Sequence, residues 1–178
     1  MASAFGHAYA AFVMGKSFYF KKGLAWLIFT GIVCSIVPDL DVVSFSLGIP
    51  YESFWGHRGF THSFVFSIIL GFASTFLFEQ NIASRKFILI WFYLFACTAS
   101  HAILDAMTSG GLGVAFFAPF DNTRYFLPWR PIKVSPIGAS KFFGEWGLKV
   151  LLNEAIWIGI PSTIYLILVA IFKRLRSK

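Results

Sequence analysis

The sequence predicts an all-α integral membrane protein, a bundle of about four membrane-embedded helices with a further helix near the N-terminus. Three observations predict it. Of the 178 residues, 57% are hydrophobic and only 13% are charged, whereas a soluble domain carries roughly a quarter charged residues. Long apolar segments divide the chain, and basic residues gather at their ends. At this length we expect one domain, covering residues 1–178.

Each of four apolar segments is long enough, or nearly so, to cross a bilayer as a helix. A hydrocarbon core of about 30 Å requires roughly 20 helical residues. The first two segments reach that length only with flanking residues or local bilayer thinning. A shorter apolar stretch, 3–15, is expected to pack on the others as the N-terminal helix. The four segments cover residues 23–37, 63–78, 87–104 and 155–172.

The basic residues predict an orientation. If the four segments alternate in direction, one basic set falls in short connections and at segment ends on a single side, which the positive-inside rule makes cytoplasmic. The net charge of +7 then reflects topology and anionic lipid headgroups rather than nucleic acid binding. This set comprises Lys16, Lys21, Lys22, Arg85, Lys86, Lys173, Arg174, Arg176 and Lys178.

On the opposite side the same topology gathers most of the residues that can bind a metal. Ionisable groups at membrane depth cost several kcal/mol unless they are paired or bound to a metal. Imidazole and carboxylate are also ligands that divalent transition metals favour. The sequence therefore predicts a metal site at this face. The group contains all four histidines, three of the four aspartates and one glutamate: His7, Asp39, Asp41, His57, His62, His101, Asp105 and Glu154.

The spacing within this group predicts how its members point. His101 and Asp105 are four residues apart and share one face of a helix. Asp39 and Asp41 follow Pro38, and in an extended segment they would point the same way.

His57 and His62 are five residues apart and diverge on a continuous helix, so we expect His62 to be the ligand and His57 to lie in a loop or to orient a ligand. Glu154 opens the fourth segment, where it is either a ligand or a helix cap favoured by the helix dipole.

The long connection between residues 105 and 154 is rich in glycine, proline and aromatic residues. A structureless loop of this length is uncommon in a compact domain. We therefore expect it to fold over the ends of the membrane helices or to lie in the interface.

The order of the motifs resembles that of the YdjM-like family of LexA-regulated, membrane-bound, metal-dependent hydrolases. After His7 the chain reads "PDLD" (38–41), "HRGFTHS" (57–63) and "HAILDAMTSGG" (101–111). The resemblance extends from His7 to about Arg130. This family is similar in turn to the zinc-dependent phospholipases C and the single-strand-specific zinc nucleases, which are all-helical and hydrolyse phosphate esters.

The resemblance implies a zinc phospholipase C-like core in which Asp105 bridges two metal ions. The chain has no histidine after His101 to complete the third site of those relatives. We therefore expect two zinc ions, with manganese or iron as alternatives. The ligands implied by the resemblance are His7, Asp39 or Asp41, His62, His101 and Asp105.

The expected function is a multi-pass, metal-dependent hydrolase of the bacterial inner membrane. It would cleave a phosphate ester of a lipid or lipid-linked substrate at the periplasmic face with metal-activated water. Asp39 or Asp41 would act as the catalytic base, and Thr61 and Thr108 would orient metal ligands or cap helices. The substrate phosphate would be held by arginines: Arg58, Arg124 and Arg130.

Other interpretations use the same residues. Each residue type alone has a common explanation that needs no metal site. Histidines lie at membrane interfaces, aspartates cap helices and arginines contact lipid headgroups. A metal-binding sensor or transporter without catalysis is one alternative, although a transporter needs ligands near mid-bilayer and these lie at segment ends. A nuclease is another, which the hydrophobic setting disfavours. Membrane lipids are thus the expected partners and nucleic acid is not.

Overall fold

The protein is a bundle of helices, seen here in a computed structural model that describes residues 1–18 and 23–176. The described residues contain no β-strand. Lys21, Lys22 and Lys178 of the basic set lie outside the described residues. The α-helices are α1 (Ala4–Ser17), α2 (Leu24–Ile36), α3 (Val43–Ser46), α4 (Phe64–Thr75), α5 (Arg85–Ala106), α6 (Ala139–Phe142), α7 (Glu145–Glu154) and α8 (Ile160–Arg176).

Three shorter elements connect these helices. A 3₁₀-helix, η1 (Val37–Val42), continues α2 into α3, and a second, η2 (Phe60–His62), leads into α4. A π-helical turn, η3 (Ala155–Gly159), joins α7 to α8 without a break.

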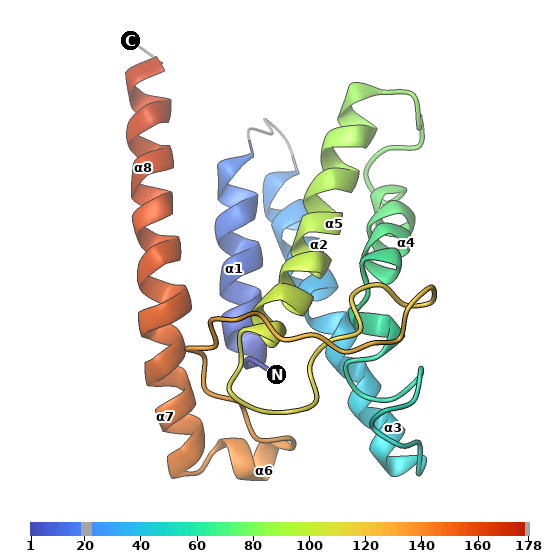
Figure 1. Ribbon diagram of the computed structural model, residues 1–178. Coiled ribbons are helices and arrows are strands. Elements are labelled where there is room, and N and C mark those ends of the chain that lie inside the picture. The colour runs from blue at the N-terminus through green and yellow to red at the C-terminus, as the bar shows by residue number, and fades with distance from the viewer. Residues whose placement is uncertain (19–22, 177–178) are drawn as a thin grey trace.

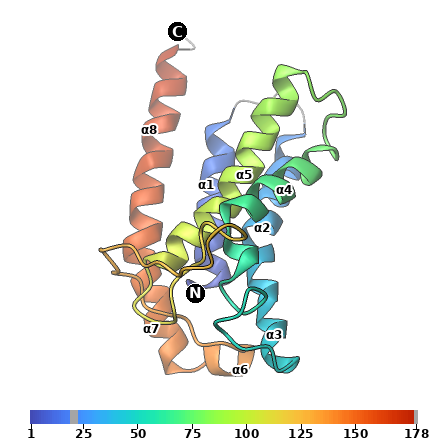
Figure 2. The same ribbon diagram turned by 45° about the vertical axis from the view of Figure 1, so that its right-hand side comes forward.

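The long helices lie side by side and alternate in direction (Figure 1), as the topology drawn from the basic residues requires. The N-terminus, α3, α6 and the connection after α5 lie at one end of the bundle, which we call the site end. The turn between α4 and α5 and the last turn of α8 lie at the other (Figures 1 and 2).

Within the described residues, three helical stretches are long and apolar enough to cross a membrane: Leu24–Ser46, Arg85–Ala106 and Glu145–Leu175. The helix α4 is apolar but has only 12 residues, about 18 Å at 1.5 Å per residue. The predicted start of the fourth segment at residue 155 is wrong. Because η3 continues the helix, that stretch begins ten residues earlier, at Glu145.

Local sequence explains where several helices begin. Ser3, Ser63 and Ser84 precede α1, α4 and α5, and each side chain accepts a hydrogen bond from the backbone N–H three residues on. This is the usual N-cap arrangement. Pro38 occupies the first turn of η1, a position where its missing N–H costs nothing.

The helices α1, α2 and α5 cross closely around Tyr93, which is fully buried. A Cβ atom added to Gly15 or Gly31 would lie 2.7 or 2.2 Å from the Tyr93 hydroxyl oxygen, so only glycine fits at either position. The Tyr93 hydroxyl donates to the Ala11 carbonyl at 3.2 Å. Small residues at crossings are how membrane helices approach closely without a hydrophobic driving force between them.

The connection between α5 and α6 folds back on the end of α5. Ser109 N–H donates to the Ile132 carbonyl at 2.8 Å, and Leu127 N–H donates to the Ala106 carbonyl at 3.0 Å. Val114 and Tyr125 exchange a pair of backbone hydrogen bonds within the connection. The site end of the bundle is therefore covered by ordered chain.

Candidate metal centre

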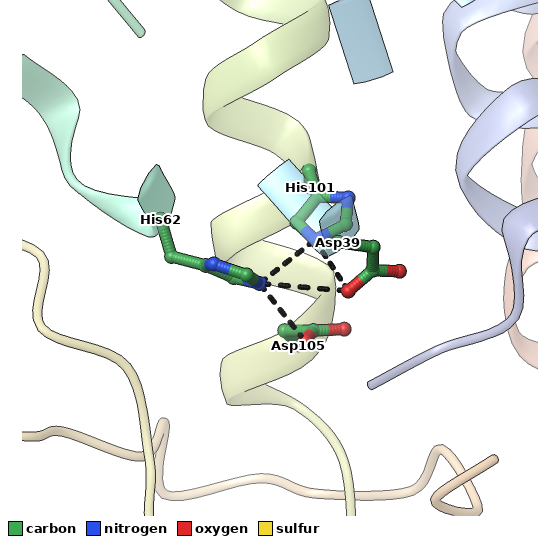
Figure 3. Close-up of side chains that lie close together, drawn as sticks. All are labelled: Asp39, His62, His101 and Asp105. Carbon is green, nitrogen blue, oxygen red and sulfur yellow. Dashed lines mark hydrogen bonds and ion pairs between the residues drawn. The ribbon is translucent and has the colours of Figure 1, made fainter. Parts of the chain in front are cut away.

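Four side chains from three elements meet at the site end: Asp39 from η1, His62 from η2, and His101 and Asp105 from α5 (Figure 3). One ligand atom from each lies within 4.8 Å of the other three. Asp39 Oδ1 is 3.4 Å from His101 Nε2, and Asp105 Oδ2 is 3.6 Å from His62 Nε2. All four side chains are buried. This number and type of ligands suits a tetrahedral divalent ion.

The two imidazoles of this group face each other through Nε2, at 3.0 Å. His101 Nδ1 lies 2.7 Å from the Ser35 carbonyl oxygen, which only accepts, so Nδ1 carries the proton and Nε2 of a neutral ring presents a lone pair. His62 Nδ1 faces Asp41 Oδ2 at 3.1 Å, which directs the second lone pair inward in the same way. Two lone pairs so close need a proton or a cation between them.

The carboxylates of this group are also incompletely hydrogen-bonded. Neither oxygen of Asp39 accepts a hydrogen bond from the described residues, and nor does Asp105 Oδ2. The ion-pair contacts of Asp39 among the described residues are with the imidazoles of His62 and His101. An unsatisfied buried carboxylate is costly, and a bound cation removes that cost. The residues present therefore fit a divalent metal ion.

His7 lies beside this group and faces the other oxygen of Asp105. Its ring stacks on His101 with centroids 3.8 Å apart, and its Nε2 is 3.3 Å from Asp105 Oδ1. Neither ring nitrogen of His7 has a hydrogen-bond partner in the described part of the chain. The backbone N–H of Ala2 donates to the same Asp105 oxygen at 2.6 Å. Asp105 thus faces His62 with one oxygen and His7 with the other.

Asp41 does not point the same way as Asp39, and the expectation of an extended segment is wrong. The chain forms η1 here, and residues two apart on a 3₁₀-helix lie on different faces. Asp41 accepts hydrogen bonds from Thr61 Oγ1 at 2.6 Å and from Arg58 N–H at 3.0 Å. His57 Nδ1 lies 2.6 Å from its other oxygen.

Asp41, His57 and His62 also form a group that could hold an ion. This second group differs from the first because its carboxylate is fully hydrogen-bonded. The geometry gives Asp41 the position of an orienting carboxylate behind a ligand histidine, an arrangement common at metal sites. Whether Asp39 or Asp41 acts as a base stays a prediction.

The carboxylates around His62 set its protonation in the metal-free protein. Burial alone would lower the pKa of His62, but the nearby carboxylates of Asp105, Asp39 and Asp41 outweigh it and raise the pKa to about 10. A proton on His62 then occupies the gap between the two imidazoles. A metal ion must displace that proton to bind.

Arg58 is fully buried, so its predicted contact with a substrate phosphate needs a different geometry from the one observed. Its Nε lies 3.0 Å from Asp105 Oδ2, and its terminal nitrogens donate to Thr108 Oγ1 at 2.9 Å and to the Gly110 carbonyl at 3.0 Å. Thr108 in turn donates to the Asp105 carbonyl at 2.7 Å. Arg58 and Thr108 therefore hold Asp105 in place.

The remaining predicted residues lie outside the four-residue group. Glu154 accepts hydrogen bonds from the backbone and hydroxyl of Ser3. It ends α7 rather than opening a helix, so its interpretation as an N-terminal cap is wrong. Arg124 donates to backbone carbonyls of the 51–57 loop, and Arg130 lies over the ring of Phe126 at 4.5 Å. A contact of either arginine with a phosphate stays a prediction.

Two partners of the centre could not be found by motif analysis. The Ser35 carbonyl and the Ala2 N–H are backbone groups, and any residue type supplies them. Ser3 had a detectable signal, because a serine directly before an apolar helical stretch is a helix start signal.

Comparison with known proteins identifies a family of inner membrane proteins. The chain matches the family described as YdjM inner membrane protein over residues 1–176. It is 34% identical to inner membrane protein YbcI of Escherichia coli (strain K12), over 91% of this chain and 93% of that protein. It is 30% identical to the uncharacterized protein YvsG of Bacillus subtilis (strain 168), over 56% of this chain and 62% of that protein.

No solved structure matches the chain, so the zinc phospholipase C-like core stays a prediction. The family match covers nearly the whole sequence, including each residue of the four-residue group. The chain therefore belongs to the YdjM family of inner membrane proteins.

Proposed function

We propose that this protein is a membrane-bound, metal-dependent hydrolase that cleaves a phosphate ester of a lipid or lipid-linked substrate. The observation that carries the proposal is the four-residue group itself. Its imidazole nitrogens and carboxylate oxygens converge within 4.8 Å, and no structural role requires so many costly groups in one place.

Two ions, most simply zinc, would share this site. Asp39, His62, His101 and Asp105 would hold the first. His7 and the second oxygen of Asp105 would contribute to the other, which makes Asp105 the bridge. Manganese and iron accept the same ligands, and metal analysis distinguishes them.

When bound, such ions would supply acidified water and would offset the charge that develops on a phosphoryl group. The protein's own contribution is to hold the ligands. The Ser35 carbonyl and Asp41 fix the ring orientations of His101 and His62. The ion pair with Arg58 holds Asp105 between His62 and His7. A rigid, buried arrangement of this kind keeps each ligand near its productive geometry.

The position of the site supports a membrane substrate. Asp105 lies in the last turn of the candidate span Arg85–Ala106, so the site is at the end of a span rather than at mid-bilayer. Such a position favours a substrate phosphate at headgroup level and disfavours transport. The basic residues at the opposite end of the bundle support a periplasmic site under the positive-inside rule.

The test is metal content and phosphoesterase activity of detergent-purified protein. Wild type is expected to hold a transition metal and to hydrolyse phosphatidic acid or another lipid phosphate, with loss of both properties in His101→Ala and after chelation. Ser100→Ala is the matched control. Ser100 is next to His101 in the chain, and in the described structure its hydroxyl only donates to the Cys97 carbonyl.

The same assay separates the alternatives. Hydrolysis of single-stranded nucleic acid but not lipid phosphate would identify a nuclease. Bound metal without hydrolysis of either substrate would indicate a sensor or transporter. Wild-type protein that neither carries nor binds metal would refute the proposal.

A further inference from the structure

A hollow of about 320 Å³ opens beside the metal centre, between η1, α3, the loop that follows α3 and the start of α4. Ligand pockets typically enclose about 300–1,000 Å³, so its volume is at the low end of that range. Most of its wall is apolar, including Leu40, Val43, Leu47 and Trp55. Figure 2 shows α3 at the site end of the bundle, below α2 and α4.

The hollow lies close to the metal centre. Asp41 and Thr61 form part of its wall, and both also contact the inward-facing ligand His62. Asp41 Oδ2 lies 3.1 Å and Thr61 Oγ1 lies 3.2 Å from His62 Nδ1. A molecule in the hollow is therefore separated from the four-residue group by a single layer of side chains.

One polar wall residue lacks a partner. Ser44 is only 4% exposed and lines the hollow, yet its hydroxyl has no hydrogen-bond partner in the described structure. A buried hydroxyl without a partner is destabilising. The mouth of the hollow is otherwise apolar, since Leu40, Leu47 and Trp55 are each more than 60% exposed. This combination suits a long apolar chain that carries one polar group.

We propose that this hollow seats a hydrocarbon chain of the lipid substrate, with the Ser44 hydroxyl donating to an ester or ether oxygen at the head of that chain. The inference rests on the proposed function and adds to it where the tail lies. A tail in this position requires a lipid substrate that reaches the site from the surrounding leaflet. The chain enters past Trp55 and α3, and its phosphate lies toward His62.

Binding tests the inference without turnover. Metal-depleted protein in detergent would be irradiated with phosphatidic acid that carries a diazirine on one acyl chain, and the labelled peptides mapped by mass spectrometry. We expect labelling concentrated on residues 37–66. Val43→Trp fills the hollow and should reduce that labelling about tenfold, a typical effect of losing a few methylene contacts.

Val33→Trp is the matched control, because Val33 is also an exposed valine but lies on α2 outside the hollow. It should leave labelling of residues 37–66 unchanged. Labelling spread evenly over the lipid-facing helices, or reduced equally by both variants, would overturn the inference.

Turnover gives a second, separate readout. With metal-loaded protein, Val43→Trp is expected to lower kcat/KM for long-chain phosphatidic acid about tenfold and to leave hydrolysis of p-nitrophenyl phosphate, a soluble phosphomonoester, unchanged. Ser44→Ala keeps the space and should lower only the lipid reaction. If both substrates are lost equally, the hollow is not the tail site. If wild type hydrolyses neither substrate, the proposed function fails, while the labelling result still decides whether a chain binds here.

Discussion

Asp39 and Asp41 are two residues apart, yet the structure predicts different consequences for replacing each by asparagine. Asp39 contributes an oxygen to the four-residue group and accepts no hydrogen bond from the described residues. Asp41 accepts hydrogen bonds from Thr61 and Arg58 and faces two histidines, so it acts on the metal through His62.

The size of each effect follows from these positions. Loss of an orienting carboxylate typically lowers metal affinity 10–100-fold, about 1.4–2.7 kcal/mol. We expect this for Asp41→Asn with the amount of bound metal unchanged at saturation. Asp39→Asn replaces a charged ligand by a neutral amide, so the metal affinity should fall by more than about 100-fold and metal should be absent after purification.

The assay is competition for zinc against a chromophoric chelator in detergent, with metal content measured in parallel. Asp121→Asn is the control, since that exposed carboxylate bonds only within its own turn in the described structure. If Asp41→Asn loses the ion as completely as Asp39→Asn, Asp41 is itself a ligand and does not act through His62.

Three further predictions address the centre and the fold. His62 is protonated below a pKa of about 10 in the metal-free protein, so zinc binding at pH 8 should release about one proton and should tighten as the pH rises. Calorimetry in buffers of different ionisation enthalpy measures the number of protons released. Zinc binding without proton release would contradict a protonated His62. Arg58→Lys should lower the free energy of unfolding in detergent by about 1–3 kcal/mol, because a single ammonium group cannot contact Asp105, Thr108 and the Gly110 carbonyl together. An unchanged melting temperature would show that these contacts are dispensable. Gly31→Ala places a methyl group 2.2 Å from the Tyr93 hydroxyl and should lower the free energy of unfolding by about 1–3 kcal/mol. The double variant with Tyr93→Phe should recover part of that loss, and no recovery would show that the clash lies elsewhere.

The features predicted most accurately depend on local periodicity. His101 and Asp105 lie four residues apart on a continuous helix, so their shared direction follows from helix geometry alone. Their convergence with Asp39 and His62 follows from the alternation of apolar segments, which places all the relevant segment ends at one face.

The features predicted wrongly depend on tertiary context. The segment after Pro38 is compatible with extended or 3₁₀ backbone, and this choice decides whether Asp39 and Asp41 share a direction. A π-turn has no distinct hydrophobic period, so Glu154 was assigned to a helix start. Arginine is seldom fully buried, so the sequence alone does not predict the ion pair of Arg58 with Asp105.

The ligands of the centre belong to separate membrane segments: Asp39 follows α2, His62 precedes α4, and His101 and Asp105 end α5. Membrane helices first insert independently and associate afterwards. Until these helices meet, each would carry its polar groups without the others, so a metal ion would act as a cross-link that completes the association. The supply of metal on the site side of the membrane would then govern how much of the newly inserted chain matures into folded protein.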